Sequence, residues 1–189
     1  TDYVFSGAAG RAHSENDETA PLGAYGQSKL EGEHLVAAAN SKHIIARTAW
    51  VYSPWGSNFV KTMLRLADER EEVSVVDDQR GNPTSAIDLA EALLTIATRL
   101  ATDKDTHWGT YHVTGSGPAS WHELARAVFD QLEASGGKVP RLQPVSTAEF
   151  PTTARRPANS QLDCSKLYQE FGIQLPEWRQ SLRMVVERL

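Results

Sequence analysis

The sequence of 189 residues contains little cysteine, no long hydrophobic run and no block of basic residues. Its single cysteine, Cys164, excludes an internal disulfide, and the six histidines show no ligand spacing, so we expect no metal site. No run approaches the roughly 18 apolar residues that a membrane span needs. A net charge of -5, with both signs interspersed, argues against a nucleic-acid partner. We therefore expect a globular protein in a cytoplasmic setting.

Strand-like and helix-like segments alternate along the whole chain. Strands are predicted at residues 2–5, 43–51, 73–78, 109–115 and 142–146. Helices are predicted at residues 24–40, 58–71, 86–101, 120–135, 163–172 and 176–189, and a loop at residues 79–85. This order indicates an α/β protein with a largely parallel sheet, whose ligands gather at the carboxyl ends of the strands.

Residue types at the segment ends predict where several helices begin and end. Asn58 is an N-cap candidate, and Ser120 with Glu123 forms the pattern of a capping box. Gly172 is expected to close one helix and Pro176 to open the last one.

Tyr25 and Lys29 are four residues apart, so they share one face of a predicted helix. A lysine ammonium beside a phenol favours the phenolate and lowers a pKa that is otherwise about 10, which suits acid/base chemistry near neutrality. An exposed helix start is the alternative interpretation. The functional interpretation is favoured because Thr1 and Asp2 stand at the first predicted strand, where hydroxyl groups can meet Tyr25.

The stretch GAAG, residues 7–10, imitates the start of a dinucleotide-binding fingerprint. That fingerprint needs a helix beginning at the glycines, so that a phosphate can lie on the helix N-terminus. Here the polar segment RAHSENDETAP follows instead. We expect a loop and no dinucleotide phosphate site at these residues.

Other polar and aromatic candidates each have two interpretations. Trp50 can stack on a sugar or nicotinamide, or belong to the core. Arg156, near Asn159, can grip a phosphate or be solvated. Asn58 can contribute to an anion site or only cap its helix. Gln79, in QRGNPT, can face a ligand or belong to a simple turn.

Six strings in one order carry a resemblance to a known family. TDYVFSG, YGQSKLEGE, RTAWVYSPWGSNFV, VVDDQRGNPTSAIDLA, GTYHVTGSGPASWHELA and ARRPANSQLD follow one another with compatible spacings. Together they resemble the dTDP-4-dehydrorhamnose reductases, which are extended short-chain dehydrogenase/reductases. The resemblance covers essentially the whole chain.

The resemblance implies reduction of the C4 keto group of dTDP-4-dehydro-L-rhamnose to dTDP-L-rhamnose with NADPH or NADH. Thr1, Tyr25 and Lys29 match the family's catalytic residues. The matched tyrosine protonates the developing alkoxide, the threonine polarises the carbonyl, and the lysine tunes the tyrosine and holds the nicotinamide ribose. Tyr25, Lys29 and Trp50 are the expected cofactor contacts. The expected contacts to the dTDP-sugar are Asp2, Tyr3, Trp50, Asn58, Gln79, Arg156 and Asn159.

The resemblance also implies a domain organisation. Residues 1–57 are expected to be the remaining carboxyl-terminal portion of a Rossmann-type NAD(P)-binding domain, with a doubly wound parallel sheet. Residues 58–189 are expected to form mostly a smaller α/β domain for the sugar nucleotide, with elements that return to the Rossmann sheet. Family members carry a glycine-rich cofactor-binding half before the string at Thr1. We therefore expect a carboxyl-terminal fragment that is inactive alone.

Two other functions are open at this stage. One is a regulatory, dinucleotide-binding subunit of the methionine adenosyltransferase type, and the other is a different nucleotide-sugar reductase or epimerase. Some members of the resembled family form homodimers, in certain cases with Mg²⁺, and the sequence places no ligands for that ion.

Overall fold

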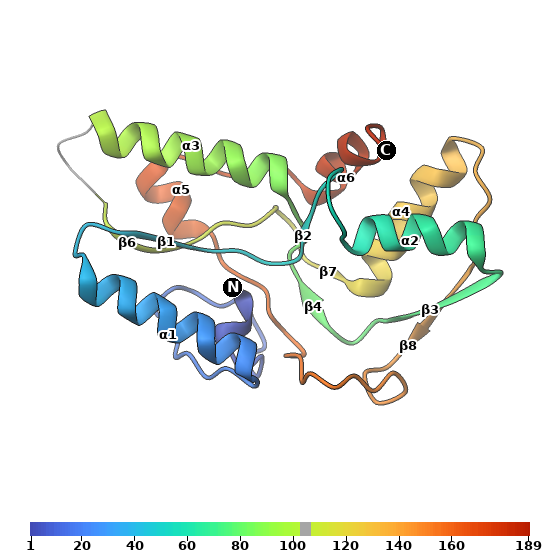
Figure 1. Cartoon of the computed structure of the whole chain (residues 1–189), viewed down its shortest axis with the longest axis horizontal. Coiled ribbons are helices and arrows are strands. Elements are labelled where there is room, and N and C mark those ends of the chain that lie inside the picture. The colour runs from blue at the N-terminus through green and yellow to red at the C-terminus, as the bar shows by residue number, and fades with distance from the viewer. Residues whose placement is uncertain (103–106) are drawn as a thin grey trace.

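Helices and short strands alternate in the computed structural model, which describes residues 1–102 and 107–189 (Figure 1). The helical elements are the 3-10 helix η1 (Asp2–Val4) and the α-helices α1 (Ala24–Ala39), α2 (Phe59–Glu69), α3 (Ala86–Thr102), α4 (Trp121–Ala134), α5 (Ser165–Phe171) and α6 (Trp178–Val186). The strands are β1 (Ile44–Arg47), β2 (Val51–Tyr52), β3 (Glu72–Val76), β4 (Arg80–Gly81), β5 (Thr84–Ser85), β6 (Gly109–His112), β7 (Ala119–Ser120) and β8 (Arg141–Val145).

The strands of the described residues form four pairs. Pairs β1–β6, β2–β5 and β3–β8 are parallel, and β4–β7 is antiparallel. Both members of each parallel pair are far apart in sequence, and helices lie between them along the chain. This arrangement confirms the α/β class and the predominance of parallel pairing.

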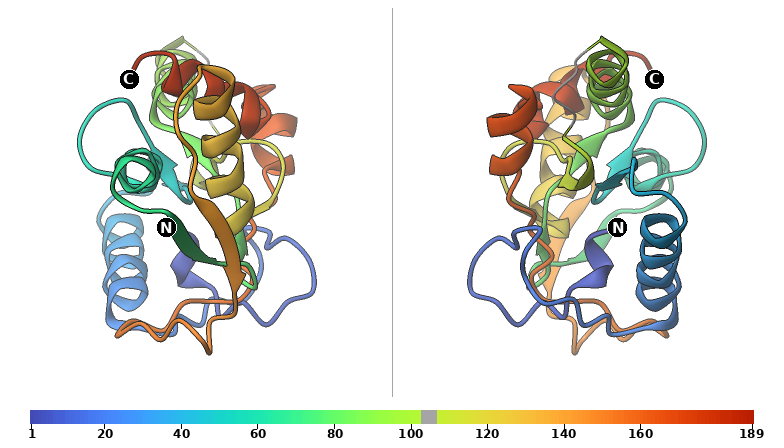
Figure 2. Two further views of the ribbon diagram at one scale, coloured as in Figure 1. Left: turned by 90° about the vertical axis from the view of Figure 1, so that its right-hand side faces the viewer. Right: turned by 90° about the vertical axis from the view of Figure 1, so that its left-hand side faces the viewer.

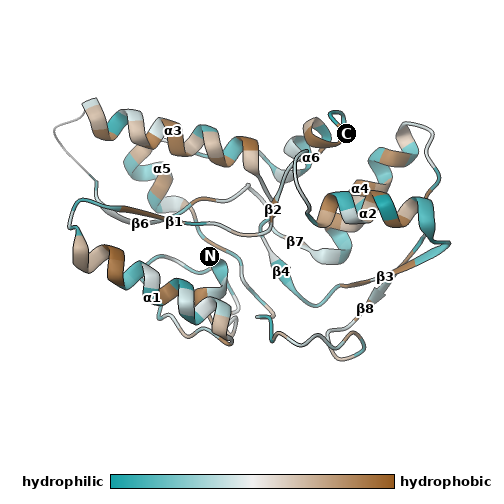
Figure 3. Cartoon of the chain, viewed as in Figure 1, coloured by the Kyte–Doolittle hydropathy of each residue, from teal (hydrophilic) through white to brown (hydrophobic). Residues whose placement is uncertain are grey.

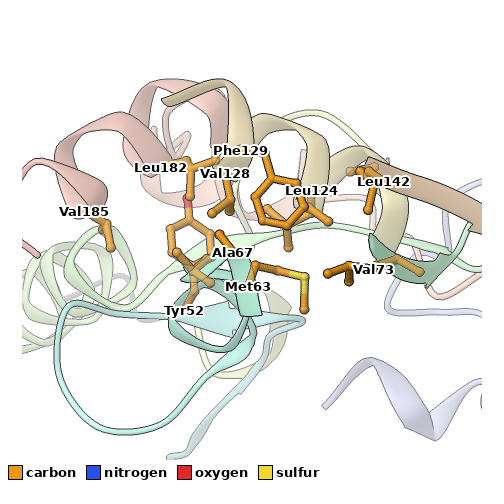
Figure 4. Close-up of a cluster of buried hydrophobic side chains, with 14 of the residues drawn as sticks. Tyr52, Met63, Ala67, Val73, Leu124, Val128, Phe129, Leu142, Leu182 and Val185 are labelled. Atoms are coloured by element: carbon orange, nitrogen blue, oxygen red, sulfur yellow. The ribbon is translucent and has the colours of Figure 1, made fainter. Parts of the chain in front are cut away.

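Two hydrophobic clusters hold most of the core. In the larger cluster, Met63 of α2 and Val73 of β3 pack with Leu124 and Phe129 of α4 and with Leu142 of β8 (Figure 4). In the smaller cluster, α3, α5 and β6 pack together through residues that include Ile96, Tyr111 and Phe171. Figure 1 shows α3, α5, β1 and β6 toward one end and α2, α4, β3 and β8 toward the other.

Helix α1 lies on a flank, away from α4 and α6 in both side views (Figure 2). Its sequence mixes hydrophobic and hydrophilic residues (Figure 3), and Gly26 is the only one of its residues that is fully buried. Leu30 packs partly against a small cluster of Val4, Phe5 and Leu162. Apolar packing therefore holds α1 only weakly.

The predicted helix ends agree with the structure in most places. The Asn58 side chain caps α2, and Ser120 and Glu123 form both bonds of the capping box at α4. Gly172, with φ of 59°, ends α5 in the left-handed conformation that glycine adopts without cost. The last helix differs, because α6 begins at Trp178 with Glu177 as its cap, after Pro176.

Three strand and loop predictions were wrong in detail. Residues Asp2–Val4 form a 3-10 helix, because the Thr1 hydroxyl accepts a hydrogen bond from the Tyr3 amide and closes a tight turn. The predicted strand 43–51 is split into β1 and β2 at Trp50, whose φ is 47°. The predicted loop 79–85 contains the two-residue strands β4 and β5.

Candidate active site

A cavity of about 500 Å³ opens beyond the carboxyl end of β1, where a parallel sheet is expected to place its ligands. The residues that line it come from Thr1 and η1, from α1, from the β1–β2 connection and the first residue of β2, and from the start of α4. They are Thr1, Asp2, Tyr3, Tyr25, Lys29, Thr48, Ala49, Trp50, Val51 and Trp121. The three predicted catalytic residues therefore line one cavity, together with three of the seven predicted sugar contacts.

Thr1 and Asp2 are tied to the end of β1. The Asp2 amide donates to the carbonyl oxygen of Thr48 at 3.2 Å. The Thr1 hydroxyl donates to Oδ1 of Asp2 at 3.1 Å, and the same hydroxyl oxygen caps η1. These bonds place the hydroxyl of Thr1 and the carboxyl of Asp2 together at the cavity wall.

Tyr25 and Lys29 lie one turn apart on α1, as their spacing predicts. The Lys29 ammonium is 5.6 Å from the centroid of the Tyr25 ring. The Tyr3 ring meets Tyr25 edge to face, with centroids 6.2 Å apart. Gly26 makes this approach feasible, because a Cβ atom there would lie 2.2 Å from the carbonyl oxygen of Tyr3. The phenol of Tyr25 is thereby held beside η1 and still reaches the cavity.

The carboxyl group of Asp2 is nearly out of reach of water, with 4% of the residue exposed. Burial raises its pKa to about 6, and the nearby hydroxyl groups of Ser160 and Thr1 act in the opposite direction. Burial likewise raises the pKa of the Tyr3 phenol to about 12, so that this hydroxyl keeps its proton at neutral pH. At one wall of the cavity, the carboxyl group of Asp2 can accept a hydrogen bond and the phenol of Tyr3 can donate one.

Several buried polar atoms at this cavity have no hydrogen-bond partner among the described residues. They are Oδ2 of Asp2, Oγ1 of Thr48, and Nε1 of Trp50 and of Trp121. A buried polar atom without a partner costs free energy comparable to a lost hydrogen bond. Residues that line the cavity thus carry one acceptor and several donors that the described residues leave unsatisfied.

An aromatic wall closes the cavity on the side of α4. Trp50 and Trp121 are stacked, with ring centroids 3.7 Å apart and planes 7° from parallel. Phe59 of α2 lies 4.8 Å from Trp121. The indole of Trp50 also lies against Gly81, where a Cβ atom would come within 2.5 Å of it. Trp50 therefore combines the two alternatives from the sequence, because it packs against other side chains and also lines the cavity.

Trp121 is a cavity residue that the sequence patterns did not reveal. Its position was predicted only as the first turn of a capped amphipathic helix. The stack joins residues 71 positions apart, and no local pattern encodes such a contact. The left-handed backbone of Trp50, which costs on the order of 1–3 kcal/mol for a non-glycine residue, is likewise held by this tertiary packing.

Four predicted sugar-nucleotide contacts lie outside the lining of this cavity. Asn58 uses its side chain in the cap of α2 and in a bond of 2.7 Å to the Ser53 carbonyl oxygen. Gln79 is buried and donates to the hydroxyl of Thr147. The remaining two share the loop before α5. Asn159 donates to the carbonyl oxygens of residues 9 and 11, and Arg156 is exposed. Their contacts to a ligand stay predictions.

The structure describes GAAG as part of an irregular segment, as expected, and no helix begins there. Gly7 adopts φ of 79° and lies against Pro157, where a Cβ atom would come within 2.4 Å. This glycine therefore permits close approach of the 151–160 loop. Within residues 1–102 and 107–189, no group of three or more His, Cys, Asp or Glu side chains could hold a metal ion. None of the described helices is long and apolar enough to cross a membrane.

Comparison with known proteins gives one consistent family. A family model described as "RmlD substrate binding domain" matches residues 1–189. The dTDP-4-dehydrorhamnose reductase of Sinorhizobium fredii is 51% identical over 187 residues, which are 98% of this chain and 63% of that protein. The chain thus spans less than two thirds of the length of this relative.

Solved structures agree with the sequence comparison. A dTDP-4-dehydrorhamnose reductase from Clostridium acetobutylicum matches with a TM-score of 0.90 and 41% identity, over 98% of this chain and 62% of that one. The dTDP-4-dehydrorhamnose reductase of Bacillus anthracis, solved in complex with NADP, matches with a TM-score of 0.87 and 39% identity, over 100% of this chain and 63% of that one.

Proposed function

The chain belongs to the RmlD substrate-binding-domain family, and we propose that it carries the proton donor and the sugar site of a dTDP-4-dehydrorhamnose reductase. The observation that carries this proposal is the convergence of Thr1, Tyr25 and Lys29 on one cavity, whose other lining residues are polar or aromatic in most cases. Such a cavity suits a keto sugar, which needs hydrogen bonds to its hydroxyl groups and a proton at its carbonyl oxygen.

The proposed substrate is dTDP-4-dehydro-L-rhamnose, and the proposed product is dTDP-L-rhamnose. When bound, NADPH or NADH supplies the hydride that C4 of the sugar receives. Tyr25 gives its phenolic proton to the oxygen on C4, and that carbonyl thereby becomes a hydroxyl group. Thr1 donates a hydrogen bond to the same oxygen and stabilises the charge that develops there. Its contact with Asp2 holds the threonine hydroxyl at the cavity wall.

Lys29 and Tyr25 are also the residues that would hold the nicotinamide ribose. Both lie on the cavity side of α1, and 56% of Tyr25 is exposed, so that a cofactor can reach them. Trp50 supplies a flat surface at the same cavity for the sugar or the nicotinamide ring. Asp2 accepts a hydrogen bond from a sugar hydroxyl group, and Tyr3 donates one.

We further propose that residues 1–57 belong to a Rossmann-type cofactor domain and residues 58–189 mostly to a sugar-nucleotide domain. Both hydrophobic clusters are built mostly from residues of the second range, and β6 of that range pairs with β1 of the first, which suits elements that return to the Rossmann sheet. Assembly as a homodimer, a cytoplasmic setting and a role for Mg²⁺ stay predictions.

The test uses the complete gene product that contains these 189 residues. With dTDP-4-dehydro-L-rhamnose and NADPH, absorbance at 340 nm should fall and dTDP-L-rhamnose should accumulate. Tyr25→Phe should reduce the rate by a factor on the order of 10² or more, because the proton donor is lost. Tyr168→Phe is a matched control, since Tyr168 is 58% exposed and lies outside the cavity.

Three outcomes would contradict parts of the proposal. A wild-type protein that consumes no NADPH with this sugar would refute the reductase function. A Tyr25→Phe variant with the wild-type rate would refute the role of Tyr25 alone. The 189-residue chain by itself is expected to show no appreciable turnover, because its described residues form no glycine-rich site for dinucleotide phosphates. Normal turnover by this chain would contradict that expectation.

A further inference from the structure

A buried ion pair joins the helix that carries Tyr25 to the strand that ends at the cavity. Arg47, the last residue of β1, donates from Nη2 to Oε2 of Glu33 at 2.7 Å and from Nε to Oε1 at 3.2 Å. The two side chains are 7% and 11% exposed. Two parallel hydrogen bonds between a planar guanidinium and a carboxylate fix orientation as well as distance, and burial keeps salt from screening them.

Glu33 lies on the same face of α1 as the two catalytic candidates, because Tyr25, Lys29 and Glu33 follow one another at intervals of four residues. In the part of the chain that the structure describes, no other side-chain hydrogen bond or ion pair links α1 to another element. Apolar contacts do little here, since Gly26 is the only fully buried residue of the helix. The rotation and depth of α1 therefore depend on Glu33.

Arg47 belongs to the strand whose carboxyl end lies at the cavity. Its carbonyl oxygen accepts a hydrogen bond from Val113 at 2.8 Å, in the parallel pairing of β1 with β6. The next residue, Thr48, accepts the bond from Asp2 that places η1. One ion pair thus connects the helix of Tyr25 and Lys29 with the strand end that positions Thr1.

We propose that Glu33 and Arg47 are positioning residues, which hold Tyr25 and Lys29 at the depth and rotation that bring them to the hydroxyl of Thr1. The catalytic part of this inference rests on the proposed reduction. Neither residue lines the cavity, so both act through the helix that they fix. A displacement of about 1 Å at a reacting group can reduce a rate by roughly 10²-fold, so this placement should be visible in the kinetics.

The test compares Glu33→Gln with Glu31→Gln in the complete gene product. Glu31 is exposed on the same helix, makes no described hydrogen bond or ion pair, and undergoes the same chemical change. For Glu33→Gln we expect a fall in kcat of about 10- to 100-fold and a change in KM for the dTDP-sugar of less than about threefold. For Glu31→Gln we expect wild-type values.

The pH dependence of the rate separates positioning from loss of folded protein. A smaller folded fraction would scale the whole pH–rate profile and leave the pH of its limbs unchanged. Movement of α1 would carry Tyr25 and Lys29 together away from Thr1 and from the buried carboxyl group of Asp2, and this change of surroundings should move the limb that reports the proton donor. A Glu33→Gln variant with wild-type kcat, or with a uniformly scaled profile, would overturn the positioning role.

Hydrogen exchange provides a readout that does not depend on reductase activity. We expect the amides of residues 24–39 to exchange faster in Glu33→Gln than in Glu31→Gln, and those of α4 to be unaffected. Unchanged exchange in α1 would show that the pair does not hold the helix, even if the sugar reduction itself were refuted. If Glu33→Gln does not fold, Glu33→Asp decides, because it keeps the charge but shortens the reach. It should fold and lose rate, and a full rate in that variant would overturn the proposal.

Discussion

The flank formed by α1 and the core around α4 are held together by different kinds of contact. Around α4, many apolar side chains pack together and stabilise the fold, and Leu124, Val128 and Phe129 are essentially inaccessible to water. The α1 flank depends on the close approach at Gly26 and on the bonds between Glu33 and Arg47.

This difference separates stability from catalysis in the molecule. A core of many apolar contacts tolerates a conservative change in one of them, since the others keep the fold. A flank held by two specific contacts leaves the cavity side of α1 open for ligands, but each contact is indispensable for geometry. Changes in the α4 core should therefore appear mainly in the free energy of unfolding, and changes on the α1 flank should appear in the rate as well.

Phe129→Ala should produce the largest loss of stability. Its ring is 1% exposed in the larger cluster, and removal of a buried phenylalanine side chain costs about 3–5 kcal/mol. Phe150→Ala is the matched control, since half of that residue is exposed, and it should cost less than about 1 kcal/mol. Urea unfolding of both variants measures the contrast. Equal losses would show that the large cluster does not dominate stability.

Asp2→Asn should change how stability depends on pH. The pKa of Asp2 is raised by burial to about 6 in the folded protein, against about 3.9 in an unfolded chain, so the folded state binds the extra proton between these values. The contribution of Asp2 to stability is therefore lost as the pH rises from about 4 to 6. Asparagine has no such proton and escapes this loss.

The expected readout is the difference in unfolding free energy between Asp2→Asn and the wild type. Between pH 4 and pH 7 this difference should change by about 2 kcal/mol in favour of the variant. His112, whose pKa burial lowers to about 3, destabilises the fold as the pH falls below about 6.5, but it does so in both proteins and cancels in the difference. A difference that is constant with pH would show that folding does not raise the pKa of Asp2.

The same contrast explains which features the sequence could predict. Helix α4 was predicted with its cap because apolar residues recur at helical spacing and Ser120 is followed by Glu123. The spacing of Tyr25 and Lys29 gave their common face, and the family strings added Thr1. Periodicity and capping are local, so one sequence is enough to recognise them.

Features that depend on contacts between distant residues could not be predicted from the sequence. The apolar residues at the end of α1 remain exposed in this chain, and η1 forms where a strand of β-branched and aromatic residues was expected. Trp50 has a left-handed backbone, and its ring stacks on Trp121, 71 positions away. The partner of Glu33 lies 14 residues away in another element. Each of these needs the three-dimensional arrangement before it can be inferred.

Gly26→Ala tests the close approach on the α1 flank. Alanine in a helix is favoured over glycine by about 1 kcal/mol, so a stabilising change would be expected from helix propensity alone. The added Cβ would lie 2.2 Å from the Tyr3 carbonyl oxygen, and we expect the clash to destabilise the protein by about 1–3 kcal/mol. The rate should fall by more than tenfold.

The control for this substitution lies on the same helix. Gly32 has no atom within 4 Å of a Cβ built on it, so Gly32→Ala should stabilise the protein by up to about 1 kcal/mol. The midpoints of thermal unfolding of the two variants should therefore change in opposite directions, and only Gly26→Ala should lose reductase rate. If Gly26→Ala also stabilised the protein and kept its rate, close contact between α1 and η1 would not be needed.

Asn58→Ala should have the smallest effect, and it tests whether a predicted ligand contact is only a helix cap. Loss of the cap on α2 should cost about 1 kcal/mol, measured by urea unfolding. Ser120→Ala is a matched loss of a cap, on α4, and should cost a similar amount. If capping is the only role of Asn58, KM for the dTDP-sugar should be the same in both variants. A rise in KM confined to Asn58→Ala would instead support the nucleotide contact, and would place a ligand-binding residue on the side of the molecule that mainly provides stability.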